Sequence, residues 1–327
     1  MSGKPIRVAV VGVGEFGRNH VRVWRELEGV ELAGIVDTDA NRAAQVASEF
    51  GTRVLNGLGS LASERVDAIS LAVPTKEHAR LGCRLLDEGF DVLVEKPMAA
   101  SLGEADELIA AAKRNGRILQ VGHVERFNPA VTAVEKIVSR PMFFEIHRLG
   151  VFTPRSLDVD VVYDVMIHDL DILLALVNAP VVDLRAVGIP VMTDKVDIAH
   201  ARIEFETGTV ANITASRVST ERVRKMRFFQ EHEYISLDFT RRDVLRIRVH
   251  PGSPQPEINF EQLAVVSEEP LHAELRAFLD SIRTRKPPVV DGFAGRRALE
   301  LADRVMSGIL EHARRVQLST YAPQDLR

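Results

Sequence analysis

The fold of the N-terminal part of the chain is decided by the stretch Ile6-Arg7-Val8-Ala9-Val10-Val11-Gly12-Val13-Gly14-Glu15-Phe16-Gly17. Its β-branched run predicts a buried strand, and the G-x-G-x-x-G pattern that follows opens a predicted helix. Gly12 permits a tight turn, Gly14 lets the backbone approach a pyrophosphate, and Gly17 allows the helix to pack closely on the strand. The helix N-terminus presents N–H groups and a dipole that favour phosphate. The stretch therefore predicts a dinucleotide site, with Glu15 and Phe16 beside the bound nucleotide.

An acidic residue, Asp37, follows the second predicted strand about 20 residues past Gly17, where the ribose-binding acid of such a site is expected. Its carboxylate would accept hydrogen bonds from a free ribose 2′-OH and would repel a 2′-phosphate. Thr38 and Asp39 add no positive charge, although Arg42 lies one turn into the next helix and could reach the site. We therefore expect NAD rather than NADP.

The pattern of apolar runs divides the chain into two domains, residues 1–122 and 123–327. Through residue 122 short strands alternate with amphipathic helices, which predicts the doubly wound parallel sheet of a Rossmann domain. Among the helix signals are Thr75 as the cap of a helix over 76–88 and a capping box at Ser101-x-x-Glu104. After residue 122 we expect an α+β domain with an open, mainly antiparallel sheet. Its helices are expected over 129–138, 163–177, 271–284 and 294–313, and its strands over 143–149, 181–191, 199–206, 209–216, 226–230, 234–239 and 245–250.

Composition excludes several classes of protein. The 327 residues are 46% hydrophobic and 27% charged, which is typical of a globular protein. A net charge of −4 argues against a nucleic-acid partner. The single cysteine excludes an intrachain disulfide and a cysteine-based metal site. No apolar run is long enough for a membrane span and no signal peptide is evident, so we expect a cytoplasmic protein.

Two further motifs carry candidate chemistry. Lys96, within Glu95-Lys96-Pro97, follows a predicted parallel strand at the edge of the sheet where ligands bind. It could hydrogen-bond a substrate hydroxyl or be an ordinary surface lysine. Asp164 and His168 share one face of a predicted helix. The histidine could take the proton of an alcohol, or the two could be a structural pair. The run His168-Asp169-Leu170-Asp171 lacks a second histidine one turn away, so we expect no metal site.

The order of these motifs resembles the glucose–fructose oxidoreductase / inositol dehydrogenase / rhizopine catabolism (Gfo/Idh/MocA) family. The resemblance extends to Val73-Pro74-Thr75 with His78, to 270–278 and to Arg296-Arg297-Ala298-Leu299. It implies a homodimeric or homotetrameric oxidoreductase. It also implies that Pro74, Thr75, His78, Glu95 and Lys96 lie at the cofactor. Catalysis would fall to Lys96, Asp164 and His168, with His168 as the acid/base, Lys96 positioning the reacting C–OH and Asp164 supporting them.

The segments 122–130, 153–162, 193–199 and 214–219 resemble the branch of this family that is similar to UDP-N-acetylglucosamine 3-dehydrogenase. That resemblance implies NAD-dependent oxidation at C3 of the UDP-sugar, followed by a pyridoxal-phosphate aminotransferase in lipid A precursor synthesis. The expected substrate residues are Arg126, Asn128, Arg155, Lys195 and Arg217. Of these, Arg155, Lys195 and Arg217 could meet the diphosphate, or be solvated or structural charges. The basic cluster of Arg222, Arg224 and Lys225 is assigned no role.

Two other functions remain open: an inositol or free-sugar dehydrogenase of the same family, and a non-catalytic NAD-binding sensor. For oligomerisation, alternating apolar positions in the predicted strands could supply a contact between sheets. These positions are Ile203, Phe205, Val210, Ile213, Phe229 and Ile235, some of which must pack inward.

Overall fold

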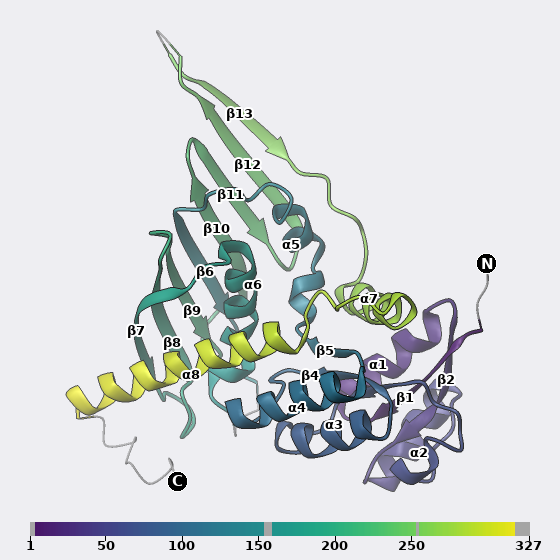
Figure 1. Cartoon of the computed structure of the whole chain (residues 1–327). Coiled ribbons are helices and arrows are strands. Elements are labelled where there is room, and N and C mark those ends of the chain that lie inside the picture. The colour runs from purple at the N-terminus through teal and green to yellow at the C-terminus, as the bar shows by residue number, and fades with distance from the viewer. Residues whose placement is uncertain (1–3, 154–158, 253–254, 318–327) are drawn as a thin grey trace. The chain divides into compact units, whose positions relative to one another are not determined.

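The computed structural model describes residues 4–153, 159–252 and 255–317 (Figure 1). The chain forms two compact units. The first comprises Met1–Phe127 and Glu268–Arg296, and the second comprises Asn128–Ser267 and Arg297–Arg327. The domain boundary expected after Gly122 stays a prediction. Among the described residues, no helix has both the length and the apolar character that a membrane span needs.

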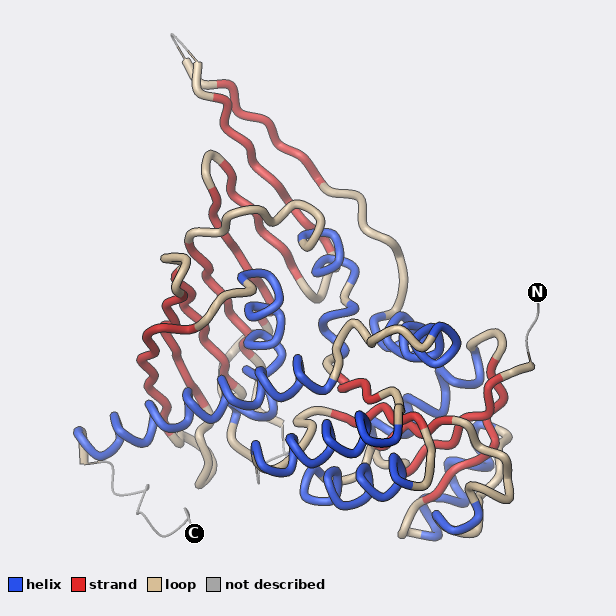
Figure 2. Tube along the Cα trace, in the orientation of Figure 1, coloured by secondary structure: helices blue, strands red, loops and turns tan. Residues whose placement is uncertain are grey.

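The first unit is built on a five-stranded parallel sheet of order β2-β1-β3-β4-β5, which confirms the predicted Rossmann arrangement (Figure 2). Its strands are β1 (Ile6–Val11), β2 (Val30–Val36), β3 (Ala68–Leu71), β4 (Asp91–Glu95) and β5 (Leu119–Gly122). Its helices are α1 (Glu15–Glu26), α2 (Ala40–Phe50), α3 (His78–Asp87), α4 (Leu102–Asn115) and α7 (Pro270–Thr284). On the side of α1 and α7, the rings of Trp24 and Phe278 meet edge to face at 6.4 Å. Strands β3 and β4 are buried along their whole length, as the apolar runs predicted.

Local sequence signals set most helix ends in this unit. Asp39 caps α2 by accepting hydrogen bonds from the N–H groups of residues 41 and 42. Ser101 caps α4, and Gly116 ends it in the left-handed conformation with φ 58°. The expected start at Thr75 is wrong, because Thr75–Glu77 form a separate 3₁₀ turn and α3 begins at His78.

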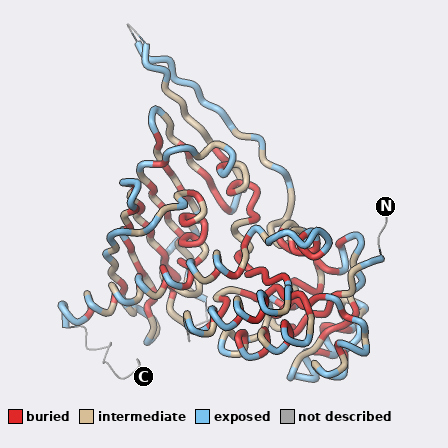
Figure 3. Tube along the Cα trace, viewed as in Figure 1, coloured by how far each residue is buried: buried red, intermediate tan, exposed pale blue. Residues whose placement is uncertain are grey.

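The second unit contains an eight-stranded sheet of order β13-β12-β11-β10-β6-β9-β8-β7. Its strands are β6 (Phe143–Leu149), β7 (Val181–Ile189), β8 (Ile198–Phe205), β9 (Val210–Ser216), β10 (Val223–Gln230), β11 (Glu233–Asp238), β12 (Asp243–His250) and β13 (Glu257–Gln262). Every neighbouring pair is antiparallel except β6 and β9, which run parallel, so the sheet is mixed. The sequence did not predict β13, all six of whose residues are exposed (Figure 3).

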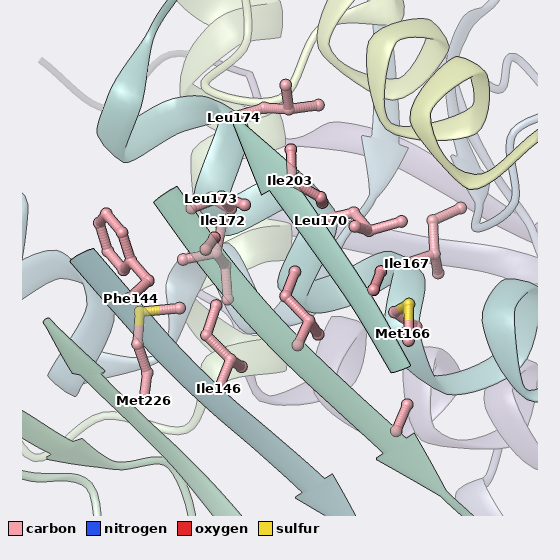
Figure 4. Packing of buried hydrophobic residues seen from close by; sticks show 14 of the residues in the cluster. Phe144, Ile146, Met166, Ile167, Leu170, Ile172, Leu173, Leu174, Ile203 and Met226 are labelled. Carbon is pink, nitrogen blue, oxygen red and sulfur yellow. The ribbon is translucent and has the colours of Figure 1, made fainter. Parts of the chain in front are cut away.

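Helices cover one face of this sheet and enclose its core. They are α5 (Pro129–Val134), shorter than expected, α6 (Ile167–Val177), and the part of α8 (Gly292–Arg315) from Arg297 onward. Leu170 and Leu173 of α6 pack over the sheet beside Phe144 and Ile146 (Figure 4). Of the positions proposed for a contact between sheets, Ile203, Phe205, Ile213 and Ile235 belong to this core. The opposite face carries half-buried residues, among them Val210, Phe143, Phe229 and Tyr234; the Phe229 ring stacks on Phe143 at 5.9 Å and meets Tyr234 at 5.2 Å.

Candidate active site

The turn between β1 and α1 uses each of its three glycines differently. A Cβ on Gly17 would lie 1.8 Å from the carbonyl oxygen of Gly12, so no side chain fits there. Gly12 has φ +85°, and a Cβ on it would lie 2.5 Å from the Ala72 carbonyl oxygen. A Cβ on Gly14 would meet nothing within 4 Å. Gly14 also gives the N-terminus of α1 no side-chain cap. The space at Gly14 is therefore open to a ligand, and this arrangement fits the pyrophosphate of a dinucleotide.

Asp37 is held at the end of β2 by four hydrogen bonds. The N–H of Val13 donates to Oδ2 and that of Asp39 to Oδ1, both at 2.8 Å. Arg42 donates from Nε to Oδ2 at 3.2 Å and from Nη2 to Oδ1 at 3.0 Å. Burial alone would raise the pKa of the Asp37 carboxyl, but these hydrogen bonds hold that pKa below its usual range. The carboxylate is thus ionised and oriented at the place where a ribose would bind.

A cleft of about 480 Å³ in the first unit contains this turn. Of the residues predicted to bind the cofactor, Gly12, Gly14, Glu15, Phe16, Asp37 and Pro74 line it. Gly17 acts through helix packing instead. The cleft is also lined by Arg42, Arg80 and Arg84; the first was noted as within reach from its spacing, and the other two were not anticipated.

His78 links two loops rather than lining the cleft. Its Nδ1 lies 2.9 Å from the Pro97 carbonyl oxygen, and its Nε2 lies 2.8 Å from that of Val73. Burial lowers the pKa of His78 more than these two carbonyls raise it. The neutral ring therefore donates to one carbonyl at a time. It ties the loop that carries Pro74 and Thr75 to the loop that carries Lys96.

Glu95, at the end of β4, is set in a buried polar network beneath Lys96. His20 Nε2 lies 2.9 Å from Glu95 Oε1, and His20 Nδ1 lies 2.7 Å from Ser70 Oγ. Burial would raise the pKa of Glu95, but the hydrogen bond with His20 and the positive charge of Lys96 help to bring it below its usual value. A Cβ on Gly122 would lie 2.7 Å from Glu95 Oε1, so the glycine leaves the room that this carboxylate occupies.

The same network contains the one group among the described residues with the composition of a metal site: His20, Glu95 and Glu274, whose ligand atoms can lie within 4.8 Å of one another. These residues are distant in sequence, which is why sequence reasoning missed the group. The hydrogen bond between His20 and Glu95 already uses two of the three ligand atoms. We therefore treat the group as a hydrogen-bonded network, and the absence of a metal stays a prediction.

His123 is a further residue that sequence reasoning did not select. It is buried directly after β5, and burial, followed by the charge of Lys96, lowers its pKa to about 3. Its imidazole is thus neutral at physiological pH and adds no positive charge beside Lys96. Arg126 is half-buried in the short helix that follows, and its charge also lowers the pKa of His123.

In the second unit, Asp164 and His168 lie on either side of a change in helix type. Asp164 belongs to a π-helical turn (η4, Val162–Met166), and His168 is the second residue of α6. Such π turns are frequent at functional sites. Next to His168, Asp169 accepts two hydrogen bonds of 2.8 Å from Arg148, whose guanidinium lies 4.6 Å from the centre of the Phe239 ring. This buried ion pair fixes the start of α6 to strand β6.

Arg217 is anchored inside the fold. Its Nε donates to Asp197 Oδ1 at 2.7 Å, its Nη1 to the Val159 carbonyl at 2.6 Å, and its Nη2 to Thr193 Oγ1 at 3.0 Å. Asp197 also accepts three backbone N–H groups from residues 191–193. Burial would raise the pKa of Asp197, but these donors hold that pKa far below its usual range. The pair shapes the loop that carries Lys195, which is half-buried.

A cavity of about 360 Å³ in the second unit is lined by Asp164 together with Arg148, Arg217, Arg222 and Arg224. The last two belong to the cluster that was assigned no role. Asn128 lies elsewhere: its Oδ1 caps α5, and its Nδ2 donates to the Phe239 carbonyl at 3.1 Å. Arg155 lies outside the described residues. The roles proposed for Arg126, Asn128, Lys195 and Arg217 in substrate binding stay predictions.

Both units match models of the same protein family. Residues 6–123 match the NAD-binding Rossmann fold model of the GFO/IDH/MocA oxidoreductase family, and residues 132–235 match its C-terminal domain model. The chain is 39% identical over 305 residues to UDP-N-acetylglucosamine 3-dehydrogenase from Acidithiobacillus ferrooxidans, covering 92% of this chain and 96% of the relative. It is 28% identical to scyllo-inositol 2-dehydrogenase (NAD⁺) from Bacillus subtilis, covering 65% of this chain and 68% of the relative.

Solved structures extend the comparison to three dimensions. The Acidithiobacillus enzyme superimposes with a TM-score of 0.87 at 38% identity, covering 93% of this chain and 97% of that one. An NAD-binding protein from Listeria innocua has a TM-score of 0.82 at 19% identity, covering 94% and 96%, and shows the fold alone. The glycine-rich turn after β1, the acidic residue at the end of β2 and these matches agree. The chain belongs to the GFO/IDH/MocA family of NAD(P)-dependent oxidoreductases, dehydrogenases that act on sugar hydroxyls.

Proposed function

We propose that this protein oxidises the C3 hydroxyl of UDP-N-acetylglucosamine to a ketone, with NAD as the hydride acceptor. The observation that carries the proposal is the extent of the likeness to the Acidithiobacillus enzyme, 39% identity over 92% of this chain. The inositol 2-dehydrogenase of Rubrobacter xylanophilus is 34% identical over only 51%. The likeness to the sugar-nucleotide enzyme therefore includes most of the second unit.

The reaction requires the protein to position an alcohol and to accept its proton. The nicotinamide, when bound, supplies the hydride acceptor. The Lys96 ammonium donates a hydrogen bond to the reacting oxygen and stabilises the negative charge that develops there. His168 accepts the hydroxyl proton, and the Asp164 carboxylate stabilises the resulting imidazolium. The buried Glu95–His20 hydrogen bond holds the strand end from which Lys96 extends.

The choice of NAD over NADP rests on Asp37. Its carboxylate is ionised and oriented by Arg42 and two backbone N–H groups. A ribose 2′-OH would donate to it, whereas a 2′-phosphate would be repelled.

The product and the assembly follow from the same proposal. A 3-keto sugar nucleotide is a substrate for a pyridoxal-phosphate aminotransferase, which would form the 3-amino sugar of a lipid A precursor. The sheet face that carries Phe143, Phe229 and Tyr234 is the surface on which we expect a second copy to pack, giving a dimer or tetramer.

The test is NADH formation by the purified protein with NAD and UDP-N-acetylglucosamine. Glutamate and a sugar-nucleotide aminotransferase are added to remove the ketone, and mass spectrometry identifies the product. Wild type should form NADH together with a UDP-3-amino sugar, and Lys96→Ala should form neither at a comparable rate. N-acetylglucosamine and myo-inositol serve as phosphate-free controls. NADH from myo-inositol but not from the UDP-sugar would replace the proposal with inositol oxidation, which the 28% identity to the Bacillus enzyme makes the second candidate.

A further inference from the structure

We propose that Arg222, directly before β10, and Arg224, its second residue, form the subsite for the diphosphate of the substrate. The inference rests on the proposed function, because it assumes a sugar nucleotide. It concerns the cavity of about 360 Å³ described above, which lies entirely within the second unit. The cavity is formed by the end of β6, the end of β9, the start of β10 and the π-helical turn that carries Asp164.

The register of the sheet places Arg224 and Arg148 on the same face. Arg224 of β10 lies directly opposite Arg148 of β6, so their side chains leave the sheet on the same side. The next paired residues of the two strands on that side, Met226 and Ile146, are in the core beneath α6. Lys225 leaves on the opposite side, 3.9 Å from Asp238. The basic cluster in the sequence is therefore divided by the sheet, and only Arg222 and Arg224 line the cavity with Asp164.

The four arginines of the cavity differ in burial. Arg148 and Arg217 are buried and form ion pairs with Asp169 and Asp197 at 2.8 and 2.7 Å. Their charges are balanced by these carboxylates inside the fold. Arg222 and Arg224 are exposed, so water and solutes reach their guanidinium groups.

The lining is suited to an anion that contacts the two exposed arginines. It contains the guanidinium groups of four arginines and, from Asp164, a carboxylate. Guanidinium forks bind phosphate oxygens with two parallel hydrogen bonds each, and two neighbouring forks match the two phosphates of a nucleoside diphosphate. A neutral polyol such as inositol would gain nothing from these charges.

The experiment measures binding of UDP itself, without turnover, by calorimetric titration of the full-length protein. Arg222→Gln and Arg224→Gln should each weaken UDP binding about tenfold, and the double variant about a hundredfold, because each substitution removes a charge-assisted hydrogen bond. The wild-type affinity should also fall with added salt more steeply than that of the double variant. Arg185→Gln is the matched control, since Arg185 is an exposed arginine on β7 and does not line the cavity.

NAD binding and melting temperature should stay unchanged in all three variants, which separates the lost subsite from a folding defect. Wild-type protein that does not bind UDP, or equal UDP affinity in wild type and the double variant, would overturn the inference. The proposed function is judged separately. If UDP binds in an arginine-dependent way but UDP-N-acetylglucosamine is not oxidised, the subsite stands and the proposed reaction fails. If the sugar nucleotide is oxidised equally well and UDP is bound equally tightly by the double variant, the reaction stands and the subsite fails.

Discussion

Replacing Asp37 with serine should shift the cofactor preference from NAD toward NADP. In the native protein the Asp37 carboxylate lines the cofactor cleft and is paired with Arg42 at 3.0 and 3.2 Å. Serine removes the negative charge and releases the Arg42 guanidinium to meet a 2′-phosphate. Its hydroxyl can still accept one of the two backbone hydrogen bonds that the carboxylate accepts from Val13 and Asp39.

The magnitude follows from two terms. A hydrogen bond to a charged group contributes about 1.5–3 kcal/mol, so the loss of the ribose contact should weaken NAD binding about tenfold to a hundredfold. Two like charges about 5 Å apart repel by roughly 3 kcal/mol at an effective dielectric constant of about 20, and this repulsion of NADP disappears. The ratio of NADP affinity to NAD affinity should therefore rise by at least about a hundredfold.

The assay is fluorescence titration with NADH and NADPH, followed by kcat/KM with each oxidised cofactor. Asp39→Ser is the matched control: Asp39 lies two residues away and is exposed, and serine can still cap α2. That variant should keep the native preference. If Asp37→Ser leaves the ratio of the two affinities unchanged, then Asp37 does not contact the ribose and our reading of the cleft is wrong.

Further predictions concern the turn, a buried ion pair and the proposed catalytic group. Gly17→Ala should lower the melting temperature and abolish NADH binding, because its Cβ would lie 1.8 Å from a backbone oxygen. Gly14→Ala should keep the wild-type melting temperature but bind NADH more weakly. Equal melting temperatures for the two variants would contradict this difference. Asp197→Asn should cost about 3–5 kcal/mol of unfolding free energy in denaturant titrations at pH 7, since it removes the carboxylate that forms an ion pair with the buried Arg217 guanidinium. Because the Asp197 pKa is lowered by folding, its stabilisation is present above the unfolded pKa of about 3.9 and is lost as the pH falls below it, so wild type should lose more stability than the variant between pH 5 and pH 3. His168→Ala or Lys96→Ala should reduce turnover by about a hundredfold or more with NADH affinity nearly unchanged; near-normal turnover in both would refute their catalytic role.

The structure confirms predictions that rest on local rules. The glycine turn was predictable because its steric constraints act between residues a few positions apart, as between Gly12 and Gly17. The cap at Ser101 and the left-handed end at Gly116 were predictable for the same reason. Strand β13 was missed because its residues are exposed and pair only with β12, so they carry no burial pattern. The parallel pairing of β6 with β9 was missed because strand order depends on contacts between distant segments.

In the candidate site, too, local motifs were predictable from the sequence and long-range contacts were not. That Gly12, Gly14 and Asp37 lie around one cleft could be predicted from spacing alone, because the strand–turn–helix unit imposes that spacing. The partners that fix the site could not. His20 meets Glu95 across 75 positions, and Arg148 meets Asp169 across 21. Spacing says nothing about which of many charged residues will be brought together.

By itself, the sequence determined the two kinds of sheet, the dinucleotide turn and the type of chemistry, because these depend on short-range periodicity and steric rules. Only the tertiary structure decided which arginines form buried ion pairs and which line a cavity. Arg217, expected at the substrate, is anchored by Asp197, whereas Arg224, assigned no role, lines a cavity with Asp164. The reason is physical: the use of a charge depends on its burial and its partners, and both are set by which strands of the sheet become neighbours.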